Sequence, residues 1–304
     1  MSAVQPASAV AVPGLQLKHI LVPTDFSEHS HSALQQAAAI ARLHGSDLTV
    51  LHVIPPEPVI NSALEPATWE YETVVQHARE EMNAAEKNVI ADVKHKYLME
   101  TGPLKTVLQR VIHDRDISLV VLGTHGRTGI KKLMLGSAAE EIYRVAACPV
   151  MTIGPDMESK LLTHGCFQSV LFATDFSAGS KHALPYALGF AAESHARLAL
   201  LHVLEEGSVA AMYLHQQFAK NARETLESMV PTHGNITYPP DVEVVSGYPV
   251  EEILRVARKN QADLIVLGVH KASGIGASTS AHLPWTIAST VVCHAKCPVL
   301  TVRG

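Results

Sequence analysis

The sequence has few cysteines, few aromatic residues and no excess of positive charge. Four widely spaced cysteines in 304 residues cannot form a disulfide framework, so we expect reduced thiols and a cytoplasmic protein. The formal net charge of -5 provides no basic surplus for binding nucleic acid or an anionic membrane surface. No apolar run is long enough to span a bilayer, and residues 1–16 resemble a flexible tail rather than a secretory signal. These absences argue against nucleic-acid and membrane partners.

Several signatures of catalysis and ligand binding are also missing. The phosphate-loop pattern G-x-x-x-x-G-K-[ST], the dinucleotide pattern G-x-G-x-x-G and the hydrolase pattern G-x-S-x-G do not occur. The 18 histidines show no recurring metal-ligand spacing, and we interpret Cys293 and Cys297 as buried thiols rather than metal ligands. No catalytic residue is assigned, and the chemistry that the sequence indicates is binding.

The two halves of the chain repeat each other in the same order. HILVPTDFS at 19–27 returns as SVLFATDFS at 169–177, and SLVVLGTHG at 118–126 returns as DLIVLGVHK at 263–271. Such self-similarity indicates a duplicated domain. We therefore predict three parts: a tail over 1–16, a first domain over 17–155 and a second domain over 166–304.

Each half alternates short apolar runs with longer helical patterns, which is typical of βαβ units and a parallel sheet. The apolar runs are nearly continuous, as expected of strands covered on both faces. The fold class predicted is α/β, with two tandem, doubly wound parallel sheets of five strands each. In the first half we predict strands over 18–23, 48–53, 97–101, 118–122 and 149–153 and helices over 30–43, 70–95, 104–114 and 137–146.

A glycine-rich stretch, GTHGRTGIKKLMLGS at 123–137, follows the fourth predicted strand. Its glycines leave amide groups open to a close ligand, and Gly136-Ser137 begins a helix whose positive end favours an anion. A plain turn explains these glycines equally well, and Ser137 can equally cap its own helix. Arg127, Lys131 and Lys132 add positive charge nearby and have a secondary role. The local pattern is therefore compatible with a polyphosphate but does not require one.

Pro23-Thr24-Asp25 follows the first predicted strand. A ligand of an open doubly wound sheet binds outside the carboxyl ends of the strands, where the strand order reverses. If the first and fourth strands are neighbours, this segment and the glycine-rich stretch meet there. Asp25 has an alternative role as a cap for the next helix. Its position favours a carboxylate that binds ribose hydroxyls or a magnesium ion on the phosphates.

Both halves resemble the universal stress protein family, across essentially the whole chain beyond the tail. ATP-binding members carry G-x2-G-x9-G-[ST], which occurs here as Gly123, Gly126 and Gly136-Ser137. The V-P-T-D-F-S at 22–27, the L-H-V at 51–53 and the C-P-V at 148–150 are similar to other landmarks of the family. The resemblance implies an adenine nucleotide alpha hydrolase-like, Rossmann-like fold that binds ATP and Mg, and a nucleotide-dependent role in stress response or signalling.

The resemblance also implies a role for each matching residue. The nucleoside and the metal, the latter through Asp25, would be contacted by Pro23, Thr24, Asp25, Val53, Leu122 and Gly123. The phosphates would lie against His125, Gly126, Arg127, Gly136 and Ser137. Family members typically pair through their last strands, here 148–153 and 297–302. The resemblance therefore implies a pseudo-dimer within one chain or a homodimer of two chains.

The second half departs from the family's pattern. Lys271 stands in place of Gly126, four residues are inserted in the loop 271–285, and Trp285-Thr286 stand in place of Gly136-Ser137. We therefore predict that ATP binds in the first domain and that the second is empty or atypical. Two alternatives stay open: an ATP-independent interaction module, and a slow ATP-hydrolysing or nucleotidyl-transfer enzyme. Any hydrolysis should be slow, because no general base or arginine finger can be assigned.

Overall fold

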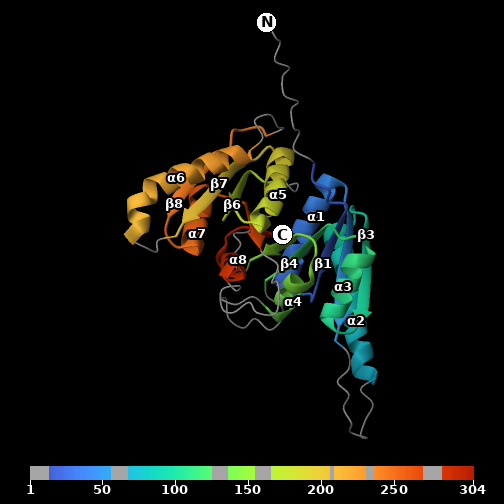
Figure 1. Ribbon diagram of the computed structural model, residues 1–304. Helices are drawn as coiled ribbons and strands as arrows, with labels where there is room; N and C mark the ends of the chain where they lie inside the picture. The colour runs from blue at the N-terminus through green and yellow to red at the C-terminus, as the bar shows by residue number, and fades with distance from the viewer. Residues whose placement is uncertain are drawn as a thin grey trace. The chain divides into compact units, whose positions relative to one another are not determined.

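The computed structural model describes residues 14–55, 68–124, 136–154, 166–205, 209–230, 236–269 and 283–304 (Figure 1). By its internal contacts the chain divides into two compact units. One unit comprises Gln16–Gly165 and Val292–Leu300, and the other comprises Met1–Leu15, Cys166–Val291 and Thr301–Gly304. The two sequence repeats are described in turn below.

The described part of the first repeat forms a parallel sheet with the strand order β3-β2-β1-β4-β5. The strands are β1 (His19–Pro23), β2 (Asp47–Ile54), β3 (His95–Thr101), β4 (Leu119–Gly123) and β5 (Val150–Ile153). The helices are α1 (Glu28–His44), α2 (Thr68–Ala85), α3 (Leu104–Asp114) and α4 (Ser137–Val145). From β1 to β3 the chain adds strands toward one side of the sheet, and from β4 it adds them on the other side of β1. The strand order therefore reverses between β1 and β4, as the predicted site requires.

The second repeat has the same plan, with the strand order β10-β9-β6-β7-β8 in its described residues. Its strands are β6 (Ser169–Ala173), β7 (Arg197–Leu204), β8 (Asp241–Ser246), β9 (Leu264–Val269) and β10 (Val299–Arg303). Its helices are α5 (Ala178–Ser194), α6 (Val209–Met229), α7 (Pro249–Lys259) and α8 (Leu283–His294). The predicted fold class, α/β with tandem parallel sheets, is confirmed.

The central strands are buried on both faces. Ile20, Leu21 and Val22 of β1 have no exposed surface, and Val170, Leu171 and Phe172 of β6 have none either. Because crossovers between parallel strands are right-handed, α1 and α2 cover one face of the first sheet, and α3 and α4 cover the other. In agreement, α3 packs against α4. Because helices cover both faces, the carboxyl ends of the strands form a separate edge of the sheet. Side chains from loops and helix starts surround this edge.

One predicted element ends in the wrong place. The predicted helix over 70–95 ends earlier, because α2 is followed by the π-helical turn η1 (Glu86–Ile90) and the chain is extended from His95. Residues 91–93 carry helix-compatible side chains, so the sequence pattern continues past the true end. Burial of Ile90 and the bond from the Leu48 amide to the Lys94 carbonyl (2.9 Å) instead direct the chain into β3.

Candidate functional site

Both repeats build the same tight turn between the first strand and the first helix. In the first repeat the Phe26 amide donates to Thr24 Oγ1 and the Ser27 amide donates to Asp25 Oδ1, both at 3.1 Å. These bonds hold Phe26 at a φ of 63°, a left-handed conformation that is uncommon for a residue with a side chain. The cap of α1 is Ser27, whose Oγ accepts from the Ser30 amide at 3.3 Å. Asp25 therefore braces the turn and is not the helix cap.

A histidine on the second strand secures this turn, and the sequence analysis gave it no role. His52 Nδ1 donates to the Thr24 carbonyl oxygen at 2.8 Å, and its ring lies 4.6 Å from the ring of Phe26, centroid to centroid. In the second repeat His202 makes the same 2.8 Å bond to Thr174, and its ring stacks on Phe176 at 4.3 Å. The recurrence of Leu-His-Val within the second strand of both repeats was the available signal.

The first glycine of the glycine-rich stretch is required by packing. A Cβ placed on Gly123 would lie 2.8 Å from backbone atoms of His29, in the first turn of α1. A Cβ on Gly268, the matching residue of β9, would lie 2.2 Å from the Ser180 amide nitrogen of α5. Bare backbone at this strand end therefore lets the helix start approach the neighbouring strand, with or without a ligand.

The two ends of the glycine-rich loop are held together. The Gly136 amide donates to the Thr124 carbonyl at 3.0 Å, and the Thr124 amide donates to the Ile153 carbonyl at 3.1 Å. Thr124 is completely buried at the end of β4. The loop thus leaves and re-enters the fold at one point beside β5. The predicted contacts His125, Gly126 and Arg127 lie outside the described residues, as do Lys131 and Lys132.

The helix that follows this loop starts without a side-chain cap. Gly136 occupies the cap position of α4, and no side-chain hydrogen bond closes the helix there. Ser137 is the first residue inside the helix, so its alternative role as the N-cap is wrong. The unpaired amides of a first helical turn favour an anion.

The structure places the described candidates at the carboxyl edge of the first sheet, on both sides of the reversal in strand order. Pro23 ends β1 and pairs with Leu51, and Gly123 ends β4 and pairs with Ile153. Thr24 and Asp25 follow β1 directly, whereas Val53 lies near the end of β2. Leu122 and Gly136 complete this set from β4 and from the start of α4. The arrangement is suited to binding.

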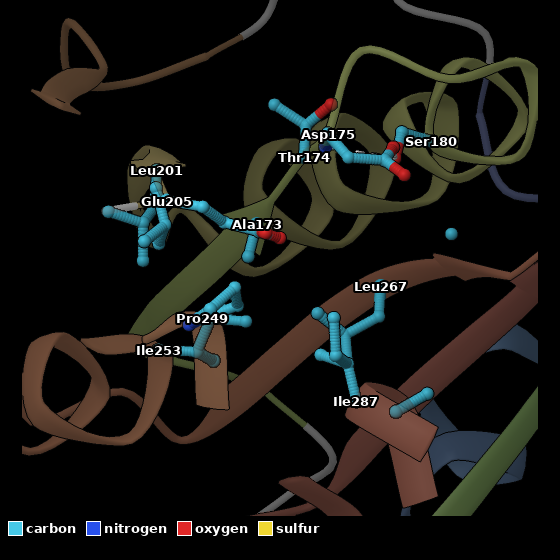
Figure 2. A pocket seen from close by; sticks show the side chains of 13 residues that line it. Ala173, Thr174, Asp175, Ser180, Leu201, Glu205, Pro249, Ile253, Leu267 and Ile287 are labelled. Atoms are coloured by element: carbon cyan, nitrogen blue, oxygen red, sulfur yellow. Dashed lines mark hydrogen bonds between the residues drawn. The ribbon is translucent and has the colours of Figure 1, made fainter. Parts of the chain in front are cut away.

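In the second repeat the matching edge contains a cavity of about 200 Å³ (Figure 2). Its floor and walls come from the ends of β6, β7 and β9 and from α7 and α8. The polar groups that line it are Thr174, Asp175, Ser180 and Glu205. The Asp175 carboxylate accepts from Ser180 Oγ at 2.6 Å and from the Ser177 amide at 3.0 Å.

The protonation state of Asp175 follows from these contacts. Burial disfavours its charged form, but the hydrogen bonds from Ser177 and Ser180 outweigh burial and hold the pKa of the Asp175 carboxyl below its usual value. The carboxylate at the cavity wall is therefore charged at neutral pH and acts only as a hydrogen-bond acceptor.

The helix that follows the matching loop of the second repeat also begins at a different position from α4. Helix α8 begins at Leu283, three residues before Thr286, which matches Ser137. Trp285, which matches the cap glycine Gly136, is therefore part of the first helical turn. Lys271 lies outside the described residues.

The described residues contain no group of three or more His, Cys, Asp or Glu side chains placed to hold a metal ion. Cys293 and Cys297 are buried, in agreement with their interpretation as thiols in the core. Burial raises the pKa of Cys148 to about 12 and also raises that of Cys293. Within the same part of the chain no helix is long and apolar enough to cross a membrane.

Comparison with known proteins decides the family. Residues 16–154 and 167–303 each match the sequence profile of the Universal stress protein family. The chain belongs to the universal stress protein family. It is 28% identical over 294 residues to a universal stress protein of Mycolicibacterium smegmatis, covering 93% of this chain and 96% of the relative. The matches of both repeats to the family profile confirm the resemblance predicted from the sequence, and the chain is a tandem universal stress protein.

Two further comparisons agree with this assignment. Universal stress protein A homolog 1 of Coxiella burnetii is 31% identical over 148 residues, which are 46% of this chain and 97% of that protein. The crystal structure of a universal stress protein from Archaeoglobus fulgidus aligns with a TM-score of 0.65 at 21% identity. That alignment covers 95% of this chain and 97% of the other, so the likeness in fold extends over both repeats.

Proposed function

We propose that this universal stress protein binds ATP with magnesium at the carboxyl edge of the first repeat and acts as a nucleotide-dependent stress-response or signalling protein. The observation that supports this most directly is the convergence of the braced Asp25 turn and the tied loop base, Thr124 with Gly136, on neighbouring strands. A carboxylate and an uncapped helix start then face the same edge of the sheet. A ribose or magnesium ion requires the first feature, and phosphates require the second.

The local geometry gives each proposed contact a physical basis. The Ser27 amide orients the Asp25 carboxylate through Oδ1, and a carboxylate is a suitable group to bind a ribose hydroxyl or a magnesium ion. Pro23 and Thr24 border the ribose, and Val53 and Leu122 provide apolar contact for the base. The G-x2-G-x9-G-[ST] spacing of the loop supports the assignment of the phosphates to Gly126, Gly136 and Ser137.

Binding alone transmits no signal, since a ligand shifts a conformational equilibrium only if it binds the two states differently. The turn at Thr24–Ser27 is the element through which we expect ATP to act, because it carries the left-handed Phe26 and begins α1. Ligand contacts to Asp25 would therefore bear directly on the start of this helix.

The test is isothermal titration of nucleotide-stripped protein with ATP and magnesium. We expect one site per chain and its loss in Gly126→Lys, which introduces the residue found at the matching position of the second repeat. Absence of saturable binding would contradict the proposal. Two equivalent sites per chain would contradict its restriction to the first repeat.

A further inference from the structure

The first repeat contains a second, smaller cavity between its sheet and its helices. It measures about 120 Å³ and is bordered by α1, the end of α2, η1 and the middle of β2 and β3. Val50 of β2 and Tyr97 of β3, which are partners in register, both line it. Because successive residues of a strand face opposite sides of a sheet, Val50 and the proposed base contact Val53 face opposite sides. Of the described residues that line the cavity, only Thr24 is also a proposed nucleotide contact.

The inner walls of this cavity are apolar. Leu34, Val50 and Met82 are at most 5% exposed, whereas His31 and Asn88 are exposed and mark its mouth. The volume corresponds to roughly four water molecules at ~30 Å³ each, and a buried water typically makes about three hydrogen bonds. Water in this space would therefore need many polar partners.

The two hydroxyl groups beside α1 are already bonded within the protein. Thr24 Oγ1 donates to Ser30 Oγ at 3.1 Å and accepts from the Phe26 amide at 3.1 Å. Ser30 Oγ donates to the Ser27 carbonyl oxygen at 2.9 Å. Since both hydroxyl protons are used in these bonds, the space favours an occupant with an apolar body over a group of waters.

One tyrosine in the wall has a hydroxyl group without a partner. The Tyr97 hydroxyl oxygen is buried and makes no hydrogen bond within the part of the chain that the structure describes. Burial, together with the nearby Glu86 carboxylate, raises the pKa of Tyr97, so the phenol keeps its proton at neutral pH. A buried hydroxyl without a partner costs free energy, and most such groups in proteins are paired. An acceptor atom on an occupant of the cavity would remove this cost.

The π-helical turn η1 contributes to the same wall and is fixed to α1. Arg42 Nη2 donates to the Val89 carbonyl oxygen at 2.6 Å and to Asp92 Oδ1 at 2.7 Å. Asn88, next to Val89, borders the cavity. Short π-helical segments within helices are frequent at functional sites. The turn is therefore held in a defined position beside the cavity.

The second repeat has no equivalent of this hydroxyl. Val50 pairs with Tyr97 across β2 and β3, and the matching pair across β7 and β8 is Leu200 with Val242. A valine side chain has no hydrogen bond to donate. We therefore expect one such site per chain.

We propose that this cavity binds an uncharged compound of the small ketone class, with an apolar body and about five or six non-hydrogen atoms; for scale, an engineered apolar cavity of about 150 Å³ binds benzene. The body contacts Leu34, Val50 and Met82, and the oxygen accepts from the Tyr97 hydroxyl, which a small rotation of its ring turns toward the space. A ketone oxygen accepts without adding a donor that would itself need a partner among apolar walls. The site does not depend on ATP binding in the same repeat.

The experiment compares cyclopentanone with methylenecyclopentane, in which a CH₂ group replaces the oxygen. Full-length protein labelled at the methionine methyl groups is titrated with each compound and followed by NMR, and Met82→Leu assigns the signal of the cavity. We expect cyclopentanone to shift the Met82 signal saturably, to leave that of Met229 in the second repeat unchanged, and to bind at least tenfold more tightly than the hydrocarbon. Absence of a saturable shift, or equal affinity for the two compounds, would overturn the proposal.

Removal of single hydroxyl groups separates a binding role from a structural one. Tyr97→Phe keeps the ring and deletes only the unpaired group, so it should raise the thermal midpoint of the free protein by about 2–4 °C while weakening cyclopentanone binding at least tenfold. Tyr143→Phe is the matched control, because the hydroxyl of this buried tyrosine is hydrogen-bonded to Thr152 Oγ1. It should lower the midpoint and leave cyclopentanone affinity within twofold.

The outcomes that refute the inference are distinct. A midpoint of Tyr97→Phe that stays the same or falls would mean that the hydroxyl has a partner in the free protein, such as ordered water. Unchanged cyclopentanone affinity in this variant would remove Tyr97 from the site. Ala85→Leu fills the cavity from the end of α2, and a Met82 shift that persists in this variant would place cyclopentanone elsewhere. Failure of the protein to bind ATP would contradict the proposed function alone, because these titrations contain no nucleotide.

Discussion

The glycines at the ends of β4 and β9 provide the sharpest test of the packing argument. A Cβ on Gly268 would lie 2.2 Å from the Ser180 nitrogen and 2.3 Å from the Gly179 carbonyl carbon, and all these neighbours are backbone. A Cβ on Gly123 would lie 2.8 Å from the nearest atoms of His29. Both substitutions to alanine should therefore destabilise their own repeat, and Gly268→Ala should do so more strongly.

The distances set the expected sizes. Helix α5 must move by roughly 1 Å to give the new methyl at Gly268 an ordinary separation, and α1 by about half as much at Gly123. Overpacking of this kind costs about 1–3 kcal/mol, occasionally more. We expect about 1 kcal/mol for Gly123→Ala and about 3 kcal/mol or more for Gly268→Ala.

A third glycine provides the control. Gly45 ends α1 at a φ of 64°, with no other atom within 4 Å of an added Cβ. Gly45→Ala therefore introduces backbone strain without a clash, at a cost of roughly 1–2 kcal/mol. Gly45→Ala thus measures left-handed backbone strain without a clash, whereas Gly123 and Gly268 have no positive φ, so their substitutions measure the clash without that strain.

The assay is urea unfolding of single-tryptophan proteins. The chain has two tryptophans, Trp69 in the first repeat and Trp285 in the second, so Trp69→Phe or Trp285→Phe leaves one reporter for one repeat. Gly268→Ala should shift the unfolding midpoint reported by Trp285, and Gly123→Ala that reported by Trp69. If Gly268→Ala costs less than about 0.5 kcal/mol, or less than Gly123→Ala, the packing argument is wrong.

Two further predictions concern the turns between the first strand and first helix of the repeats. Asp175→Asn should lower stability at neutral pH, and the difference from wild type should shrink below about pH 4, the pKa of an unfolded Asp, because the native pKa of Asp175 is depressed; urea titrations across pH 2–7 measure this. His52→Leu removes the bond to the Thr24 carbonyl and should cost about 0.5–1.5 kcal/mol by the same unfolding assay, while weakening ATP binding in calorimetry.

The duplicated sequence made the fold predictable, and the limits of the prediction have identifiable causes. The apolar runs that become β1 and β4 are continuous because both faces of these strands are covered, and such runs are distinctive in a sequence. The end of the predicted helix over 70–95 was misplaced because the helix-compatible side chains continue through residues 91–93, beyond the last helical residue Ile90. The alternation of elements predicted a parallel sheet but left the strand order open, and the structure shows that β1 and β4 are neighbours.

The candidate site was only partly predictable. Asp25 could be assigned to the crevice from its position after β1, but its hydrogen bond to Ser27 and the separate cap depend on the left-handed Phe26. His52 acts through a contact between strand and turn that sequence spacing does not encode. The packing role of Gly123 likewise depends on where α1 lies, and the cavity beside Asp175 depends on side chains from α7 and α8.

The braced turn occurs twice in one polypeptide, and this has an evolutionary consequence. In an assembly of identical chains every substitution appears in all copies, so a mutation that changes ligand preference at one site changes it at every site. Here the start of α8 and the residue at 205 have diverged from their counterparts while the hydrogen bonds around Asp25 and Asp175 have been retained. Fusion of the two copies therefore allows the surroundings of one turn to change while those of the other are kept.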